Sequence, residues 1–141
     1  MMIMRRSMDY PELLGQLRSR KVAIWTCDTC ARLCNGLGGK ASAIALMDRL
    51  KADGIDVTGV ASTSASCIMS KVVPKMDSDT ILDADVVLCL TCDVGRDCAE
   101  AVSLKDCLNP VVTLGPGYLD ENMVPILADG SVVLMGCDPF I

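Results

Sequence analysis

Short continuous apolar runs alternate along the chain with stretches in which apolar residues recur every three to four positions. Continuous runs of strand length are typical of strands buried on both faces of a sheet. They predict strands at 21–26, 55–61, 84–90, 110–114 and 131–135. The helical period predicts helices over 11–19, 40–53 and 95–104, with a further short helix within 67–82.

The order of these elements predicts an α/β fold, a flavodoxin-like doubly wound parallel sheet in a single domain. Strands and helices alternate, and short connections with right-handed crossovers place such strands parallel in one sheet. Residues 1–10 are expected to form a disordered or loosely docked arm. The chain therefore divides into an arm with a short helix, 1–19, and a cysteine-rich, metal-binding α/β domain, 20–141.

Charge and hydropathy narrow the classes of partner. The net charge is −5 and no basic run extends beyond Arg5-Arg6, so a nucleic-acid-binding surface is not expected. No apolar run reaches about 18 residues, so no membrane span is expected. The mean hydropathy of +0.41 fits either buried parallel strands or an apolar patch that a partner covers.

Cysteine usage points to intracellular thiol chemistry. The first residues lack the apolar core of a secretory signal, so the expected location is a reducing cytoplasm. Nine cysteines, an odd number, are not expected to form a disulfide framework there. The absence of histidine excludes zinc sites that use His, Rieske centres and Cys-His catalytic pairs. Clustered thiols then indicate metal binding or redox chemistry.

Most of the cysteines closely follow the predicted strands. In an open parallel sheet the carboxyl ends of the strands share one edge, so thiols distant in sequence meet there. Thiolates gathered in this way bind soft metal, either Zn²⁺ or an iron–sulfur cluster. The cysteines concerned are Cys27, Cys30, Cys34, Cys67, Cys89, Cys92 and Cys137.

Four of these thiols are the predicted ligands of one site: Cys27, Cys30, Cys67 and Cys92. The first two form a CxxC motif, whose two intervening residues let both sulfurs reach one tetrahedral metal. Cys67 and Cys92 stand among small residues that leave room for a cluster. Cys34 is an alternative ligand from the same loop.

Other interpretations of the cysteines stay open. A CxxC motif also suits dithiol redox chemistry, and a cysteine is often only a small buried apolar residue. The packing interpretation fits Cys89 and Cys107 best, whereas Cys98 and Cys137 fit either. The segment Gly36–Gly39 matches no phosphate-binding motif and is interpreted as a turn that lets the backbone approach the metal loop.

Three segments resemble one protein family. They are Cys27-Asp28-Thr29-Cys30-Ala31-Arg32-Leu33-Cys34 followed by Gly38-Gly39, the pair Ser66-Cys67, and Leu90-Thr91-Cys92-Asp93-Val94-Gly95. Together they resemble the CxxCxxxC…GG element, the single mid-chain cysteine and the LxCGVG-like segment of the cysteine-rich accessory subunit of anaerobe-type methylenetetrahydrofolate reductase. This is the methylenetetrahydrofolate reductase C-terminal domain family, and the resemblance spans about residues 20–137.

The resemblance implies a [4Fe–4S] cluster or Zn²⁺ held by Cys27, Cys30, Cys67 and Cys92, with Cys34 as a possible substitute. It also implies docking onto a flavin-dependent reductase barrel and a supporting role in electron delivery. We expect the partner to cover the face that carries Gly38, Gly39, Ser64 and Gly95, with self-association through that face as the alternative. Rival functions are a structural zinc interaction module and a CxxC dithiol oxidoreductase.

Overall fold

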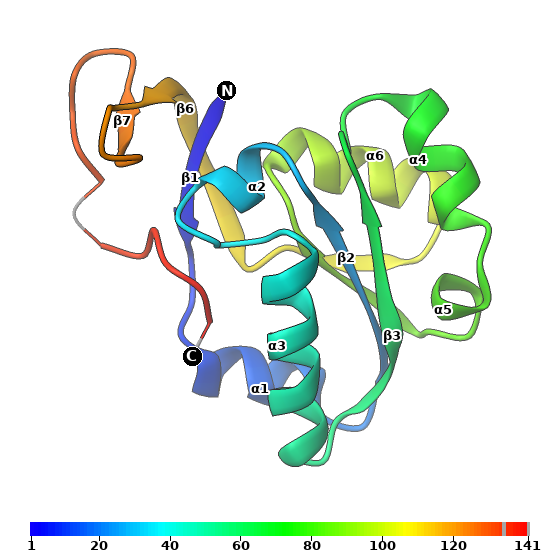
Figure 1. Cartoon of the computed structure of the whole chain (residues 1–141). Helices are drawn as coiled ribbons and strands as arrows, with labels where there is room; N and C mark the ends of the chain where they lie inside the picture. Colours follow the sequence, from blue (N-terminus) through cyan, green and yellow to red (C-terminus); the bar gives the residue numbers. More distant parts are fainter. Residues whose placement is uncertain (134, 141) are drawn as a thin grey trace.

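The computed structural model describes residues 1–133 and 135–140. It confirms the α/β class, a single domain built on a four-stranded parallel sheet that helices flank (Figure 1). The strands are β2 (Lys21–Cys27), β3 (Asp56–Thr63), β4 (Val86–Leu90) and β5 (Asp106–Leu108), in the order β3-β2-β4-β5. All three neighbouring pairs are parallel.

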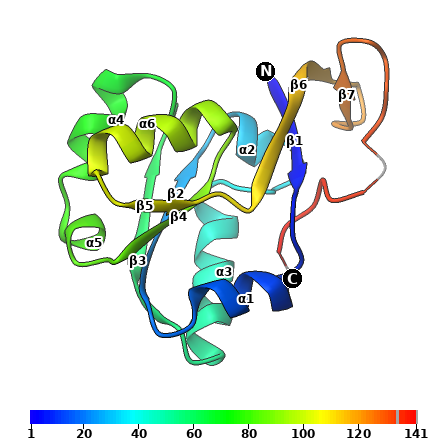
Figure 2. The same cartoon turned by 180° about the vertical axis from the view of Figure 1, so that it is seen from behind.

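Helices cover both faces of this sheet (Figures 1 and 2). On one face lie α1 (Tyr10–Leu17) and α3 (Lys40–Ala52), whose leucines join one core cluster. On the other face, α4 (Met69–Met76), α5 (Asp79–Leu82) and α6 (Asp93–Ser103) pack around Trp25 in a second cluster. The helices predicted from the periodicity are therefore present, each within about two residues of its expected bounds.

The strand order creates a topological switch point between β2 and β4. From β2 the chain moves to β3 on one side, and then returns past β2 to β4 on the other side. Connections diverge at such a point, which leaves a crevice outside the carboxyl ends of the two strands. The cysteine-bearing segments that follow β2 and β4 both begin there.

The expectation of a loose arm over residues 1–10 is wrong. Residues Met2–Arg6 form β1, which pairs antiparallel with β6 (Val111–Leu119), and β6 pairs in turn with β7 (Pro125–Leu127). Ile3 and Met4 are fully buried against the main core, so burial of these apolar side chains holds the strand in place.

The strand predicted at 110–114 exists, but it belongs to a different sheet from the one expected and ends later. The fourth parallel strand is β5, and β6 belongs to the small antiparallel sheet. β6 runs on through Gly115-Pro116-Gly117, beyond the predicted end at Leu114. The pairing with β1 shifts register between Ile3 and Met4, beside Gly115, and such irregularities accommodate glycine and proline within a strand.

The last predicted strand, 131–135, reduces to one bridge between Val132 and Ile126. Leu134 lies outside the described residues. Beyond it the chain returns to β1, where the Arg6 N–H donates to the Gly136 carbonyl at 2.7 Å. In the described part of the chain, no helix is long and apolar enough to cross a membrane.

Candidate functional site

The carboxyl ends of β2 and β4 are tied together by a buried hydroxyl. Thr26 Oγ1 donates to the Leu90 carbonyl at 3.0 Å and accepts the Gly39 N–H at 2.8 Å. Thr26 is fully buried, so this hydroxyl needs both partners. It fixes the spacing of the two strand ends and holds the glycine-rich segment over them.

Gly38 and Gly39 bring the backbone close to these strand ends. A Cβ on Gly38 would lie 2.7 Å from both the Ala31 Cβ and the Leu90 carbonyl oxygen. Gly39 has a φ of +92°, which favours glycine. The Asp28 carboxylate accepts the Lys40 N–H at 2.8 Å at the start of α3. The segment is thus a close-packed turn, as interpreted from the sequence, with a carboxylate already at the helix start.

Three thiols from two strand ends meet at the switch point. Cys27 ends β2, Cys30 begins the one-turn helix α2 (Cys30–Leu33), and Cys92 precedes α6. Burial raises the pKa of Cys92, and the charges of Cys30 and Cys27 raise it further. The Gly95 and Val94 N–H groups bond the Cys92 sulfur and oppose this shift in pKa. Cys27 and Cys30 are therefore close enough to Cys92 for their charges to act on its thiol.

Backbone groups from two other segments border these thiols. Cys27 Sγ donates to the Ser64 carbonyl at 3.9 Å, in the loop that follows β3. Cys30 Sγ accepts the Met2 N–H at 3.4 Å, from β1. The site is therefore enclosed on one side by the β3 loop and on another by the amino-terminal strand.

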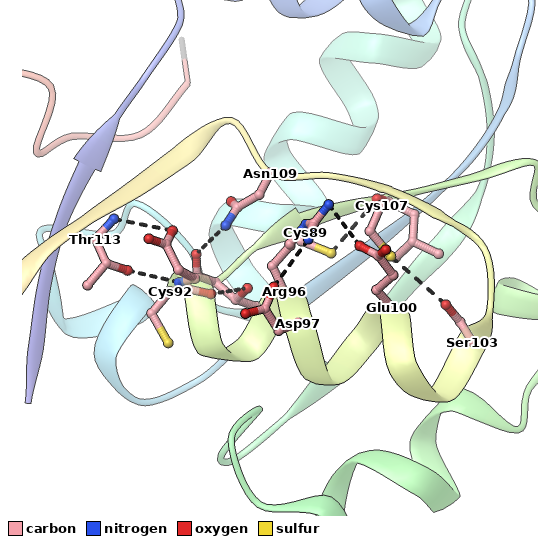
Figure 3. A network of polar contacts seen from close by, with 12 residues as sticks. Cys89, Cys92, Arg96, Asp97, Glu100, Ser103, Cys107, Asn109 and Thr113 are labelled. Atoms are coloured by element: carbon pink, nitrogen blue, oxygen red, sulfur yellow. Dashed lines mark hydrogen bonds and ion pairs between the residues drawn. The ribbon is translucent and has the colours of Figure 1, made fainter.

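The segment that carries Cys92 is anchored to β6 (Figure 3). The Asp93 N–H donates to Thr113 Oγ1 at 2.8 Å, and Asn109 Nδ2 donates to the Thr91 carbonyl at 3.3 Å. Gly95 lies under this segment, where a Cβ would come within 2.2 Å of the Ser66 hydroxyl. These contacts fix the start of α6 and, with it, the position of Cys92.

Cys67 and Cys34 lie in other surroundings. Cys67 is exposed, and its charge raises the pKa of Cys98 on α6. Cys34 is fully buried and donates to the Met2 carbonyl at 3.6 Å. A hydrogen bond from the Cys137 thiol lowers the pKa of Cys34 to about 7. The pairing of Cys34 with Cys137 had no signal in the sequence, because it depends on the return of the chain to β1.

Cys89 and Cys107 form a further pair on the opposite face of the sheet (Figure 3). Both are buried, as the packing interpretation expected. A hydrogen bond between the two thiols, together with burial, raises the pKa of Cys89. Ser103 Oγ lies 3.9 Å from Cys107 Sγ, and the Arg96–Glu100 ion pair of 2.8 Å runs along the same helix. Cys89 and Cys107 both belong to the second core cluster, around Trp25.

The donor atoms at the switch point suit a soft metal, but their positions are not those of a bound ion. Within residues 1–133 and 135–140, no three Cys, Asp or Glu side chains are arranged so that they could hold a metal ion. Zinc–sulfur bonds of about 2.3 Å require sulfurs about 3.8 Å apart around one ion. The sulfurs of Cys27, Cys30 and Cys92 would have to move to these distances to bind one ion, so metal binding stays a prediction.

The glycines expected to face a partner are covered by the chain itself. Gly38, Gly39 and Gly95 are buried, and only Ser64 of the predicted set is exposed. One exposed apolar surface that borders the site lies on the small sheet, where Met2 pairs directly with Pro116. We call this surface the outer face of the small sheet; its exposed residues are Met2, Leu114, Pro116 and Tyr118.

Comparisons with family models, with curated proteins and with solved structures find no match to this chain.

Proposed function

We propose that this chain is an accessory metal-binding subunit of a cytoplasmic redox complex of the methylenetetrahydrofolate-reductase type. In this proposal it holds a [4Fe–4S] cluster or Zn²⁺ and docks onto a flavin-dependent reductase barrel. The observation that carries the proposal is the meeting of the Cys27, Cys30 and Cys92 thiols at the switch point. The kind of complex is inferred from the three sequence segments that resemble this subunit family.

Repulsion of the Cys92 thiolate by the two thiols at the end of β2 favours a bound cation. Burial raises the pKa of Cys92, and the negative charges of Cys30 and Cys27 raise it further. A soft cation binds thiolates and reverses that repulsion. The Val94 and Gly95 N–H groups already point to the Cys92 sulfur, and such bonds tune thiolate ligands and cluster sulfurs.

Cys67 supplies the fourth thiolate in this proposal. It lies three residues beyond Ser64, whose carbonyl contacts Cys27, and the intervening loop is rich in small residues. Because Cys67 is exposed beside Cys98, the β3 loop has to turn inward when metal binds. Cys34, the alternative ligand, is engaged with Met2 and Cys137.

The outer face of the small sheet is the proposed docking surface for the reductase. Tyr118 is 53% exposed and is one of only four aromatic residues in the sequence. Tyrosine is enriched where protein surfaces bind each other. Met2 belongs to this face and also donates its N–H to Cys30. A partner on this face would therefore lie beside the metal site.

Metal and sulfide analysis of protein purified without oxygen tests the metal site. We expect about one zinc or four irons per chain. Cys27→Ser, Cys30→Ser and Cys92→Ser should each lose the metal, and Cys67→Ser should bind it more weakly. Cys89→Ala and Cys107→Ala are the matched controls and should keep it. Metal-free wild-type protein, or equal loss in all six variants, would contradict the proposal.

The kind of metal distinguishes a role in electron transfer from a structural role. An iron–sulfur cluster gives a brown protein, whereas a colourless protein with zinc supports a structural zinc module. A dithiol oxidoreductase would instead show a Cys27–Cys30 disulfide that forms and is reduced without any metal. Thiol titration before and after treatment with a chelator distinguishes that case.

Co-purification with a tagged chain tests the partner. Wild type should retain a flavin-containing reductase subunit, and Tyr118→Ser should release it while keeping its metal. The matched control is Leu104→Ser, because Leu104 is 87% exposed at the end of α6 rather than on the small sheet. A strictly monomeric protein with no reductase bound would contradict the docking, and self-association would identify a second copy as the occupant.

A further inference from the structure

The C-terminal segment, residues 136–140, is fastened to the amino-terminal strand by side chains and backbone. Arg6 contributes most: its N–H donates to the Gly136 carbonyl, and its guanidinium lies 2.8 Å from the Asp138 carboxylate. The same guanidinium stands 5.7 Å from the centre of the Phe140 ring, which is buried. The segment contains no helix or strand, so contacts of this kind, and not regular secondary structure, hold it.

Cys137 lies in the middle of this segment and meets Cys34. Asn35, next in sequence to Cys34, donates its side-chain N–H to the Cys137 carbonyl at 2.8 Å. The Cys137 side chain packs against the core cluster that contains Cys34, and the two thiols share a hydrogen bond. Cys34 is fully buried and Cys137 is half-buried, so Cys137 is the more accessible residue of the pair.

This pair differs from the other two thiol pairs in what it joins. Cys89 and Cys107 stand on adjacent strands of one sheet, so a bond between them would connect parts already held together. Cys67 and Cys98 both lie on the surface of the α4–α6 layer. Only Cys34 and Cys137 join the folded domain to a segment that lacks regular structure.

We propose that Cys34 and Cys137 form a reversible disulfide that locks the C-terminal segment onto the domain, so that this segment is a thiol-dependent latch. The oxidant is a low-molecular-weight disulfide such as oxidised glutathione. The Cys137 sulfur attacks it, forming a mixed disulfide and releasing one thiol. The Cys34 sulfur then attacks the Cys137 sulfur, forming the Cys34–Cys137 bond and releasing the second thiol. The two protein thiol protons end on the two released thiols.

Locking of the latch acts on the amino-terminal strand. Cys34 Sγ donates to the Met2 carbonyl, and Cys30 Sγ accepts the Met2 N–H, so Met2 is held between the thiol that begins α2 and the thiol that follows it. When Cys34 bonds covalently to Cys137, it loses its S–H proton and no longer donates to Met2. The oxidation state of the latch is thereby linked to the position of Met2 on the outer face of the small sheet.

Peptide mapping tests the latch on the full chain. Reduced protein, held with a chelator so that metal does not occupy thiols, is incubated with oxidised glutathione, alkylated and cut with trypsin. The fragment 33–40 contains only Cys34, and the fragment 106–141 contains Cys107 and Cys137. We expect these two fragments to become linked, with loss of two thiols. The link should persist in Cys107→Ala and in Cys98→Ser.

The two cysteine variants separate the steps. Cys34→Ser should retain a glutathione on Cys137, whereas Cys137→Ser should show neither the link nor a glutathione on buried Cys34. Carboxypeptidase should release the C-terminal residues of wild type more slowly after oxidation, and at an unchanged rate in Cys34→Ser. Wild-type protein that keeps Cys34 as a free thiol under these conditions, or that links 33–40 to a fragment other than 106–141, would overturn the proposal.

Discussion

The Thr26 hydroxyl donates to the Leu90 carbonyl at 3.0 Å and so joins the carboxyl ends of the two strands that flank the switch point. The same oxygen accepts the Gly39 N–H. One buried hydroxyl therefore sets the distance between the segments that carry Cys27 and Cys92. The geometry of the thiol site depends on a residue that is not itself a ligand.

Replacement of this hydroxyl should destabilise the protein. Thr26→Val keeps the shape of the side chain but leaves the Leu90 carbonyl and the Gly39 N–H without that partner, at a cost of about 1–3 kcal/mol. Urea unfolding measures the change. Thr80→Val is the matched control, because the Thr80 hydroxyl makes no hydrogen bond among the described residues. An equal loss in both variants would contradict the role of Thr26.

Two glycine substitutions should have opposite effects on stability. Gly95→Ala places a Cβ 2.2 Å from the Ser66 hydroxyl and 2.9 Å from the Thr91 Cβ, so the start of α6 must shift, at a cost of about 1–3 kcal/mol. Gly15→Ala, in an exposed position of α1 with nothing within 4 Å, should stabilise by about 0.5–1 kcal/mol. Thermal unfolding of both variants checks the signs, and a Gly95→Ala variant as stable as wild type would contradict the close packing.

Tyr10 should make stability depend on alkaline pH. Burial raises the pKa of Tyr10 to about 12, and its hydrogen bond of 2.6 Å to Asp53 adds to the shift. The protonated phenol is the stabilising form, so its contribution is complete below pH 10 and is lost as the pH rises through about 12. Tyr10→Phe should remove this dependence and cost about 1 kcal/mol at neutral pH.

Ultraviolet titration measures this pKa directly. The chain contains two tyrosines, so in Tyr118→Phe the only tyrosinate signal comes from Tyr10. The signal should appear near pH 12 in folded protein and near pH 10 after unfolding in urea. A folded-state midpoint near pH 10 would show that Tyr10 is neither buried nor bonded to Asp53 as described.

The nearness of the three site thiols predicts how Cys92 titrates. Burial raises the pKa of Cys92 first, and repulsion from Cys30 adds to it, so Cys30→Ser should lower that pKa. The pH dependence of alkylation at Cys92, resolved by mass spectrometry in metal-free protein, should shift to lower pH. Cys98→Ser is the control and should leave the Cys92 profile unchanged. An identical profile in Cys30→Ser would place the two thiols apart.

Local patterns predict the parallel sheet well and the small sheet poorly. Apolar runs and helical periods are local signals, and they correctly indicated β2, β3, β4 and the helices between them. The pairing of β1 with β6 joins Met2 to Pro116. These residues are distant in sequence, and no local pattern indicates that they pair. Gly115-Pro116-Gly117 resembles a turn, although it continues through a register shift.

The thiol site also combines features that local sequence patterns indicate with features that depend on distant contacts. Cys27, Cys30 and Cys92 come near one another because they lie at or shortly after the ends of two adjacent parallel strands. Cys67 and Cys34 depend on the direction of a loop and on the path of the C-terminal segment. Those features are set by tertiary contacts such as the Asn35 bond to Cys137, which no spacing of cysteines encodes.

Anaerobic titration of the metal-free protein with Co²⁺ tests the central claim most directly, because thiolate ligands produce charge-transfer absorption when they bind this ion. We predict absorption that saturates at about one ion per chain and is abolished in Cys30→Ser and in Cys92→Ser. It should be retained in Cys89→Ala. Absence of the absorption in wild type, or its persistence in both Cys30→Ser and Cys92→Ser, would contradict a metal site at the switch point.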